Sequence, residues 1–223
     1  MTIIERPRTP LAAEKPPEFM RPLFQQFARP SGWLGRIAGS LMAKGTDDDR
    51  WLVDLLEVQP DDRVLEVGFG PGVAIELIAA RATRGLVAGV DPSDVMVRQA
   101  TKRNWQAVQD GRVQLRQGSV SELPFPDASF TKVLALHSIY FWPSVEAGLR
   151  ELYRVLSTGG RLAIGVRMYQ PKSGLINPSR YGLTDDQIQD IRSTLEHIGF
   201  RAVETQQRAL RREMITAIPA HHP

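Results

Sequence analysis

The sequence predicts an α/β protein whose central sheet is mostly parallel and covered by helices on both faces. Two observations indicate this class. From Asp62 onward, short apolar runs alternate with segments of helical periodicity, which is the pattern of strand–helix–strand units. The chain has 223 residues, of which 42% are hydrophobic and 24% charged, so a single large domain can bury a sufficient core.

The apolar runs predict the strands. Five of them are expected to be parallel, and two further strands near the C-terminus are expected to pair antiparallel. The five runs are residues 63–68, 85–91, 112–118, 130–138 and 159–168, and the C-terminal pair lies within residues 200–220.

Helical periodicity and capping residues predict the helices. Residues 33–42 form one helix ending near Gly45, and a second begins at Thr46 with three aspartates in its first turn, where the helix dipole favours anions. Thr184 and Gln187 have the spacing of a capping box at the start of the last helix. The buried stripe of the second helix is expected to consist of Trp51, Leu52, Leu55 and Leu56. The remaining helices are predicted at residues 73–81, from 93, at 145–156 and at 184–198.

Composition excludes several classes of protein. The chain has no cysteine, so disulfides, thiolate metal sites and cysteine nucleophiles are ruled out, and we expect no metal site and a cytoplasmic location. The formal charge is only +3, and acids and bases are interspersed, so we expect no nucleic-acid partner. No run approaches the roughly 20 apolar residues of a membrane span, so no stable membrane insertion is expected. Residues 1–19 are proline-rich and predict a disordered tail. The sequence gives no indication of the oligomeric state.

The strongest motif is "VLEVGFGPG", Val64 to Gly72, where a buried strand turns into a helix through three glycines. Without Cβ atoms, a ligand can approach the backbone closely. The second motif is "GVDPS", whose Asp91 can accept hydrogen bonds from ribose hydroxyls. Asp91 could instead cap the next helix, a role for which Ser93 is equally suited. Both dinucleotide enzymes and S-adenosylmethionine enzymes use such an acid.

The spacing of the glycines separates these two classes. A dinucleotide fingerprint has glycine where this chain has Val73. Here the pattern is G-x-G-x-G, with Glu66 two residues before the first glycine, and it resembles motif I of the class I S-adenosylmethionine-dependent methyltransferases. The segments "GVDPSDVMVRQA", "RQGSVSELPFPDASFTKVLAL" and "LRELYRVLSTGGRLAIG" resemble later parts of the same family in the same order. The resemblance covers residues 61–167 well.

The resemblance implies a Rossmann-like, doubly wound sheet of seven strands whose last strand is antiparallel. It divides the chain into the tail, an N-terminal helical cover at 20–60 and a methyltransferase domain at 61–223. The cofactor implied is S-adenosyl-L-methionine, with S-adenosyl-L-homocysteine as product. The glycines would line its methionine end and Glu66 would support their loop, while Asp91 would hold the ribose. Ser119 stands where the family commonly has aspartate, so its contact with adenine should be weaker. The cofactor-binding residues implied are Glu66, Gly68, Gly70, Gly72, Asp91, Pro92, Ser93, Ser119, Val120 and His137.

The segment "LALHSIYFWPS" ends the fourth strand at the edge where ligands of open α/β sheets bind. A lone histidine is more often a structural hydrogen bonder than a catalyst, but the position of His137 gives the two roles equal weight. In the catalytic role, we expect it to accept the acceptor's proton or to position the acceptor. Tyr140 is a second catalytic candidate, because its ring could stabilise the sulfonium by cation–π attraction. The predicted substrate-binding residues are Tyr140, Phe141, Trp142, Arg167 and Tyr169. Trp142, next to Pro143, is the one most expected to pack in the core instead.

The predicted function is therefore an S-adenosylmethionine-dependent methyltransferase that acts on oxygen, nitrogen or sulfur of a small, partly apolar molecule. Two alternatives remain open at this point. One is an NAD(P)-dependent oxidoreductase on a Rossmann sheet, and the other is a cofactor-binding protein without catalysis.

Overall fold

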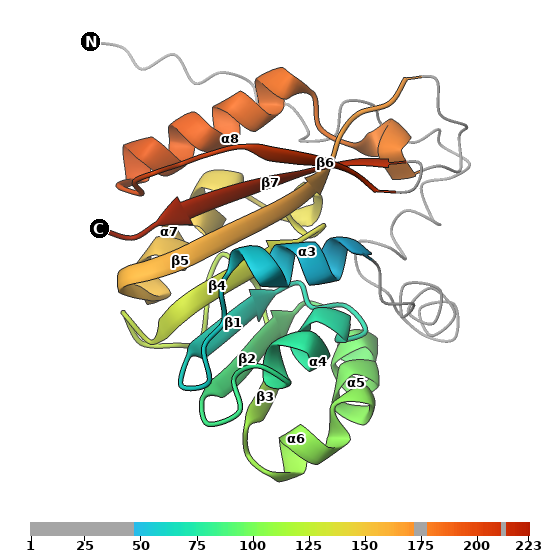
Figure 1. Ribbon diagram of the computed structural model, residues 1–223, viewed down its shortest axis with the longest axis vertical. Coiled ribbons are helices and arrows are strands. Elements are labelled where there is room, and N and C mark those ends of the chain that lie inside the picture. Colours follow the sequence, from blue (N-terminus) through green and yellow to red (C-terminus); the bar gives the residue numbers. More distant parts are fainter. Residues whose placement is uncertain (1–46, 172–177, 211–212) are drawn as a thin grey trace.

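The computed structural model describes residues 47–171, 178–210 and 213–223 (Figure 1). The predicted tail at 1–19, the predicted helix at 33–42, the proposed cap Thr46 and most of the predicted cover at 20–60 lie outside these residues. The strands are β1 (Arg63–Val67), β2 (Leu86–Asp91), β3 (Val113–Gln117), β4 (Phe130–Leu136), β5 (Leu156–Arg167), β6 (Gln206–Leu210) and β7 (Glu213–His221). The helices are α3 (Asp47–Leu55), α4 (Val73–Ala79), α5 (Asp94–Arg103), α6 (Trp105–Gln109), α7 (Val145–Val155) and α8 (Asp185–Ile198), with short 3-10 turns η2 (Ile139–Phe141) and η3 (Pro178–Tyr181).

The seven strands form one sheet in the order β3-β2-β1-β4-β5-β7-β6. All pairings among β1 to β5 are parallel, and β7 is antiparallel to both of its neighbours, β5 and β6. This confirms the predicted mostly parallel sheet with its antiparallel last strand. The strand order reverses between β1 and β4, and the carboxyl ends of strands at such a switch point are where ligands bind in open α/β sheets.

Helices cover both faces of the sheet, and alternate residues along the central strands enter the two cores. Leu65 of β1 packs in the core beneath α7 and α8, whereas its neighbour Val64 packs beneath α3, α4 and α5. In Figure 1, α3 and α4 lie in front of the strands and α7 lies behind them. Because β1, β2 and most of β4 are buried on both faces, their sequences are largely apolar at successive positions, which makes these runs recognisable in the sequence.

Helix α3 is the part of the predicted N-terminal cover that the structure describes. Its Leu52 is buried, and a Cβ atom added to Gly165 of β5 would lie 3.0 Å from the Leu52 Cγ, so a glycine is what allows this close packing. Leu56 is buried as predicted, whereas Trp51 and Leu55 are only partly buried. This packing fixes α3 across β4 and β5, with its first turn close to the carboxyl edge of the sheet.

Three local features differ from the sequence prediction. The short helix α6 was not predicted, because it has five residues and none of them is buried, so it leaves no apolar period to detect. Strand β5 begins at Leu156, where a register shift lets it pair with Phe130, so α7 ends one residue earlier than expected. The segment after β4 forms a 3-10 turn at Ile139–Phe141. The predicted capping box of α8 is present.

Candidate active site

The glycine turn between β1 and α4 has all three of its glycines at positive φ, with values of 74° for Gly68, 50° for Gly70 and 80° for Gly72. A Cβ atom on Gly68 would lie 2.4 Å from Ser138 Cβ, and one on Gly72 would lie 2.7 Å from Ala100 Cβ. A Cβ atom on Gly70 would meet nothing within 4 Å. Two of these glycines are therefore required by the protein's own packing, while Gly70 borders open space that a ligand can approach.

Asp91 at the end of β2 links this turn to helix α5. Its Oδ2 accepts a hydrogen bond from the Gly70 N–H at 3.0 Å, and its Oδ1 accepts one from the Ser93 N–H at 2.9 Å. The Ser93 hydroxyl accepts from the Met96 N–H and is the true cap of α5. Burial raises the pKa of Asp91, although the two N–H donors act in the opposite direction. Of the two residues considered as helix cap, Ser93 has that role, and the side chain of Asp91 faces the glycine turn.

Glu66 is the most deeply buried acid of the site, with 3% of its surface exposed. The Ile75 N–H donates a hydrogen bond to its carboxyl group, but Oε2 has no hydrogen-bond partner among the described residues. Burial raises the pKa of Glu66 well above its usual range, and the charges of Asp49 and Asp91 raise it further. A buried carboxyl group of this kind is costly unless a cation pairs with it. The surroundings of the glycine turn are therefore acidic.

Ser119 and Val120 follow β3 beside Asp91. The Gly118 N–H donates to the Asp91 carbonyl at 3.1 Å, which places this segment next to the "GVDPS" turn. Val120 is buried, whereas Ser119 is exposed and its hydroxyl accepts from the Ser121 N–H at 3.2 Å. Pro92 is exposed at the same edge, and its carbonyl accepts from the Gln117 side chain at 3.0 Å.

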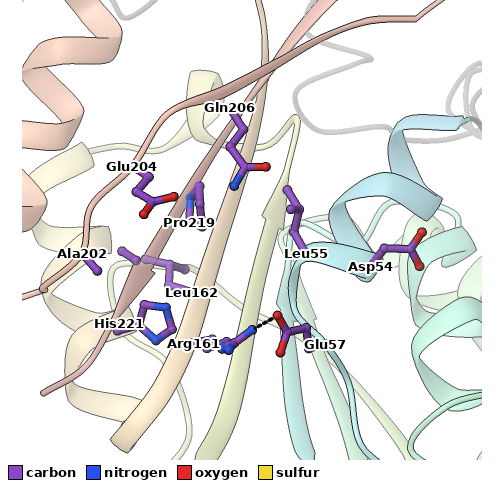
Figure 2. Close-up of a pocket in the computed structure, with 11 residues that line it drawn as sticks. Asp54, Leu55, Glu57, Arg161, Leu162, Ala202, Glu204, Gln206, Pro219 and His221 are labelled. Carbon is purple, nitrogen blue, oxygen red and sulfur yellow. Dashed lines mark ion pairs between the residues drawn. The ribbon is translucent and has the colours of Figure 1, made fainter.

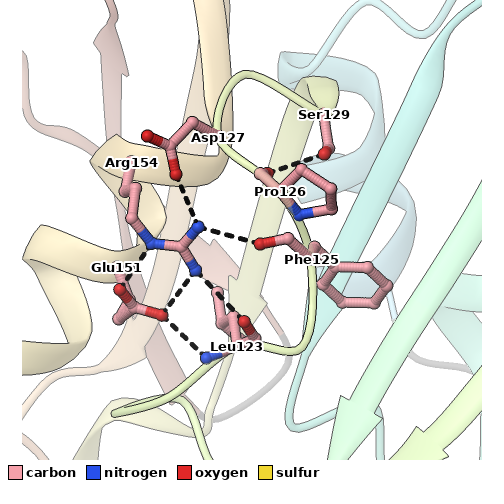
Figure 3. Close-up of polar contacts among 7 residues, drawn as sticks. All are labelled: Leu123, Phe125, Pro126, Asp127, Ser129, Glu151 and Arg154. Carbon is pink, nitrogen blue, oxygen red and sulfur yellow. Dashed lines mark hydrogen bonds and ion pairs between the residues drawn. The ribbon is translucent and has the colours of Figure 1, made fainter.

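Arg154 of α7 holds the loop that continues from this segment (Figure 3). Its guanidinium group donates to the carbonyls of Leu123 at 3.1 Å and Phe125 at 2.8 Å and pairs with Asp127 at 2.8 Å. Glu151, one turn earlier on α7, pairs with Arg154 and also accepts from the Leu123 N–H at 2.7 Å. One arginine and one glutamate thus fix the loop between β3 and β4 to the helix.

His137 follows β4 and is held on three sides. Its N–H donates to the Gly165 carbonyl of β5 at 2.9 Å, and its neighbour Ser138 donates from its hydroxyl to the Val67 carbonyl of β1 at 2.9 Å. The backbone of His137 has a φ of 52°, a conformation that non-glycine residues rarely adopt and that clusters at functional sites. The imidazole Nε2 lies 2.9 Å from Oδ2 of Asp48 in the first turn of α3.

The sequence did not predict Asp48 as a site residue. It was counted only among the aspartates of the first helical turn, yet its side chain is buried and faces His137, 89 residues away in the chain. Burial alone would raise the pKa of Asp48, but the hydrogen bond and charge of His137, together with the charge of Arg167, lower it to about 2. Burial and the charge of Arg167 lower the pKa of His137, and Asp48 only partly offsets them. At neutral pH, Asp48 is ionised and His137 is neutral.

The aromatic residues after His137 have different environments. The hydroxyl of Tyr140 accepts a hydrogen bond from the backbone N–H of Arg167, which joins this turn to the end of β5. Phe141 is 44% exposed and packs edge-on against Tyr140, with ring centroids 6.0 Å apart. Trp142 packs on α7, where a Cβ atom on Gly148 would lie 2.6 Å from its Cε3. Trp142 therefore contributes to the core, as expected for the residue next to Pro143.

Arg167 and Tyr169 are both partly buried and leave β5 at the same edge. The Tyr169 N–H donates to the Leu183 carbonyl at 2.8 Å, so the chain on either side of the loop after β5 is joined. Residues 172–177 of this loop lie outside the described residues. The structure thus brings His137, Tyr140 and Arg167 together at one edge of the sheet, beside the glycine turn.

A separate cavity of about 240 Å³ lies at the opposite edge, where Arg161 and Glu57 form an ion pair of 2.6 Å (Figure 2). It is lined by the amino-terminal half of β5, the end of β7, the end of α3 with Glu57 beyond it, and the segment that leads into β6. None of the predicted site residues lines it.

The described residues hold no group of three or more histidine, cysteine or acidic side chains arranged for a metal ion. No helix among them is long and apolar enough to cross a membrane.

Comparison with known proteins agrees with the geometry. Residues 65–164 match the family model described as a methyltransferase domain. The chain is 28% identical over 188 residues to the uncharacterized methyltransferase YdaC of Bacillus subtilis, covering 84% of this chain and 98% of that protein. It is 38% identical over 136 residues to the 27-O-demethylrifamycin SV methyltransferase of Amycolatopsis mediterranei, covering 60% of this chain and 47% of that protein. The chain spans less than two thirds of the length of most other curated relatives that it matches.

Solved structures agree in fold. A SAM-dependent methyltransferase from Aquifex aeolicus superimposes with a TM-score of 0.65 at 19% identity, covering 80% of this chain and 90% of that one. The sequence motifs, the seven-stranded sheet and the matches to known methyltransferases give one answer. Over residues 65–164 the chain matches a methyltransferase domain, it is similar in sequence to known methyltransferases, and its fold is that of a SAM-dependent methyltransferase.

Proposed function

We propose that this protein transfers a methyl group from S-adenosyl-L-methionine to oxygen, nitrogen or sulfur of a small, partly apolar molecule. The observation that carries the proposal is the buried carboxyl group of Glu66, whose Oε2 has no partner among the described residues and which lies beside the glycine turn. The cofactor carries an ammonium group and a sulfonium group, and a cation of this kind could pair with the buried carboxyl group. The residues present therefore fit the cofactor.

The roles of the cofactor-binding residues follow from their places. Gly70 leaves room for the methionine end, and Glu66 would pair with its ammonium group. Each carboxylate oxygen of Asp91 accepts one backbone N–H and has a second lone pair for a ribose hydroxyl. The residues that would border the adenine are Pro92, Ser93, Ser119 and Val120. When bound, the cofactor supplies a methyl carbon that is activated for displacement by the positive charge on sulfur.

The same acidic groups argue against the alternative of a nicotinamide enzyme. A dinucleotide would bring its negatively charged pyrophosphate to the glycine turn, next to Glu66, Asp91 and Asp49. Repulsion between the pyrophosphate and these carboxylates would raise the free energy of the complex. Val73 also argues against a nicotinamide enzyme, because the dinucleotide fingerprint has its third glycine at this position.

His137, Tyr140, Phe141, Arg167 and Tyr169 would surround the methyl acceptor. The exposed ring of Phe141 offers an apolar contact, and the neutral imidazole of His137 offers a proton acceptor. The name of the Amycolatopsis relative denotes a small-molecule acceptor, which supports an acceptor of that kind here. A cytoplasmic location and the absence of a nucleic-acid partner remain parts of this proposal, supported by the lack of cysteine and the small net charge.

Isothermal titration calorimetry tests the proposal. We expect S-adenosylhomocysteine to bind the full chain and NADH to give no heat of binding. Binding of NADH without S-adenosylhomocysteine would overturn the methyltransferase assignment. Enzymatic turnover is then followed as S-adenosylhomocysteine formed from the methyl donor with a panel of small hydroxyl, amine and thiol compounds. Tight cofactor binding with no turnover across the panel would favour the non-catalytic alternative.

A further inference from the structure

The contact between Asp48 and His137 joins the segment that precedes the sheet to the acceptor edge of the sheet. The Asp48 Oδ2 and His137 Nε2 atoms are 2.9 Å apart, and the two side chains are 10% and 17% exposed. Hydrogen bonding between two groups so well shielded from water fixes the ring's orientation more firmly than a surface ion pair would.

The contact also determines which ring nitrogen carries the proton. An ionised carboxylate can only accept a hydrogen bond, so the Nε2 atom of the neutral imidazole must be the donor. The Nδ1 atom then has no proton. It is buried, and no described group forms a hydrogen bond with it. A buried acceptor atom without a partner is rare in proteins and calls for an explanation.

The charged groups around the ring are consistent with this arrangement. Asp48 and Asp49 on α3 favour a positive charge on the imidazole, whereas Arg167 at the end of β5 opposes it. Burial adds to the effect of Arg167, and the ring is neutral when no ligand is bound. The same carboxylate is in place to stabilise the ring once it gains a proton.

We propose that Asp48 is the positioning residue of this site: by accepting the Nε2 proton of His137, it holds the imidazole in the tautomer whose Nδ1 atom can take a proton from the methyl acceptor. This inference rests on the proposed function. Nδ1 takes the proton from the acceptor's O–H bond, and the electron pair of that bond is left on oxygen to form the new bond to the methyl carbon. The electron pair of the broken carbon–sulfur bond stays with sulfur. The proton remains on His137, opposite the Asp48 carboxylate.

Nitrogen-15 NMR of the histidine side chains in the ligand-free protein tests the inference, with His137→Gln used to assign the signals. At neutral pH we expect His137 to be protonated at Nε2 and bare at Nδ1. In Asp48→Asn we expect loss of this single tautomer and a fall in the pKa of His137, because the carboxylate that favours the charged ring is gone. The matched control is Asp47→Asn, which removes an exposed carboxylate from the same helical turn and should change neither.

A proton on Nδ1 in the wild-type protein would overturn the inference, whether or not the variants fold. So would a tautomer and pKa that respond to Asp48→Asn no more than to Asp47→Asn. Calorimetry with S-adenosylhomocysteine on the same samples distinguishes a failure of the positioning role from a failure of the proposed function. If S-adenosylhomocysteine binds but His137 is protonated at Nδ1, the positioning role fails and the proposed function stands. If it does not bind, the proposed function fails.

Discussion

Single residues at this site are explained by what each would meet if it were changed. Gly68 and Gly72 are glycines because Ser138 and Ala100 leave no room for a Cβ atom, whereas Gly70 is open. Glu66 is a buried acid with a raised pKa, and its Oε2 has no hydrogen-bond partner among the described residues. A residue whose identity is not explained by packing within the protein is expected to contact a ligand.

Glu66→Gln tests the cation partner. We expect S-adenosylhomocysteine to bind about 10- to 100-fold more weakly, because a charge-assisted hydrogen bond of roughly 1.5–3 kcal/mol is lost.

The folded protein raises the pKa of Glu66, so this residue costs stability increasingly as pH rises above the range where an unfolded glutamate titrates. The ligand-free variant should therefore gain stability over wild type as pH rises from 5 to 8 in urea titrations. Unchanged affinity would remove Glu66 from the binding site.

Gly70→Ala tests the open space above the glycine turn. Gly111 provides a matched control, since it also has positive φ, at 74°, and nothing within 4 Å of an added Cβ atom. Both alanine variants should lose about 1 kcal/mol of folding free energy from left-handed backbone strain. Only Gly70→Ala should lose affinity for S-adenosylhomocysteine in calorimetry. Equal affinity of the two variants would show that no ligand approaches Gly70.

At the scale of elements, the edge of the sheet is assembled by contacts between segments far apart in sequence. Helix α7 reaches the loop after β3 through Arg154 and Glu151, and α3 reaches β4 through Asp48. The turn after β4 is joined to β5 through Tyr140 and to β1 through Ser138. Each contact fixes a loop that would otherwise be held only by its ends.

Arg154→Ala tests the loop between β3 and β4. We expect a loss of roughly 1–3 kcal/mol in folding free energy, because the carbonyls of Leu123 and Phe125 lose their donor. Affinity for S-adenosylhomocysteine should also fall, since this loop continues from Ser119 and Val120. Arg150→Ala is the control on the same helix, as its pair with Glu146 is exposed and joins two residues of that helix. Urea denaturation and calorimetry measure both effects, and an Arg154→Ala protein that behaves like Arg150→Ala would contradict the role given to this network.

At the scale of the whole molecule, two cores on either side of one sheet carry the fold, and the charged site at the carboxyl edge makes its stability depend on pH. The folded protein lowers the pKa of His137, so the unfolded chain binds more protons below about pH 6.5. The contribution of His137 is fully present above that pH and is lost as the pH falls.

His137→Gln tests this pH dependence. Between pH 7.5 and 5.5, the wild-type protein should lose about 1 kcal/mol more folding free energy than the variant, because the buried neutral ring resists protonation. Buried Glu66 and Asp91 contribute in the opposite direction but are common to both proteins, so the difference isolates His137. Urea titrations at the two pH values measure it, and parallel losses in both proteins would refute the assignment.

The sequence by itself determined the parallel sheet, its antiparallel last strand, the glycine turn and the edge that carries the site, because apolar periodicity and glycine spacing are local patterns. It also predicted that Trp142 would pack in the core. Only the tertiary structure revealed that Asp48 faces His137, that the Tyr140 hydroxyl is held by the Arg167 backbone, and that Arg154 fixes the loop beside Ser119. These contacts join segments tens of residues apart. The periodicity of apolar residues predicts helices and strands, but it does not show which side chains meet when the strands come together at a common edge.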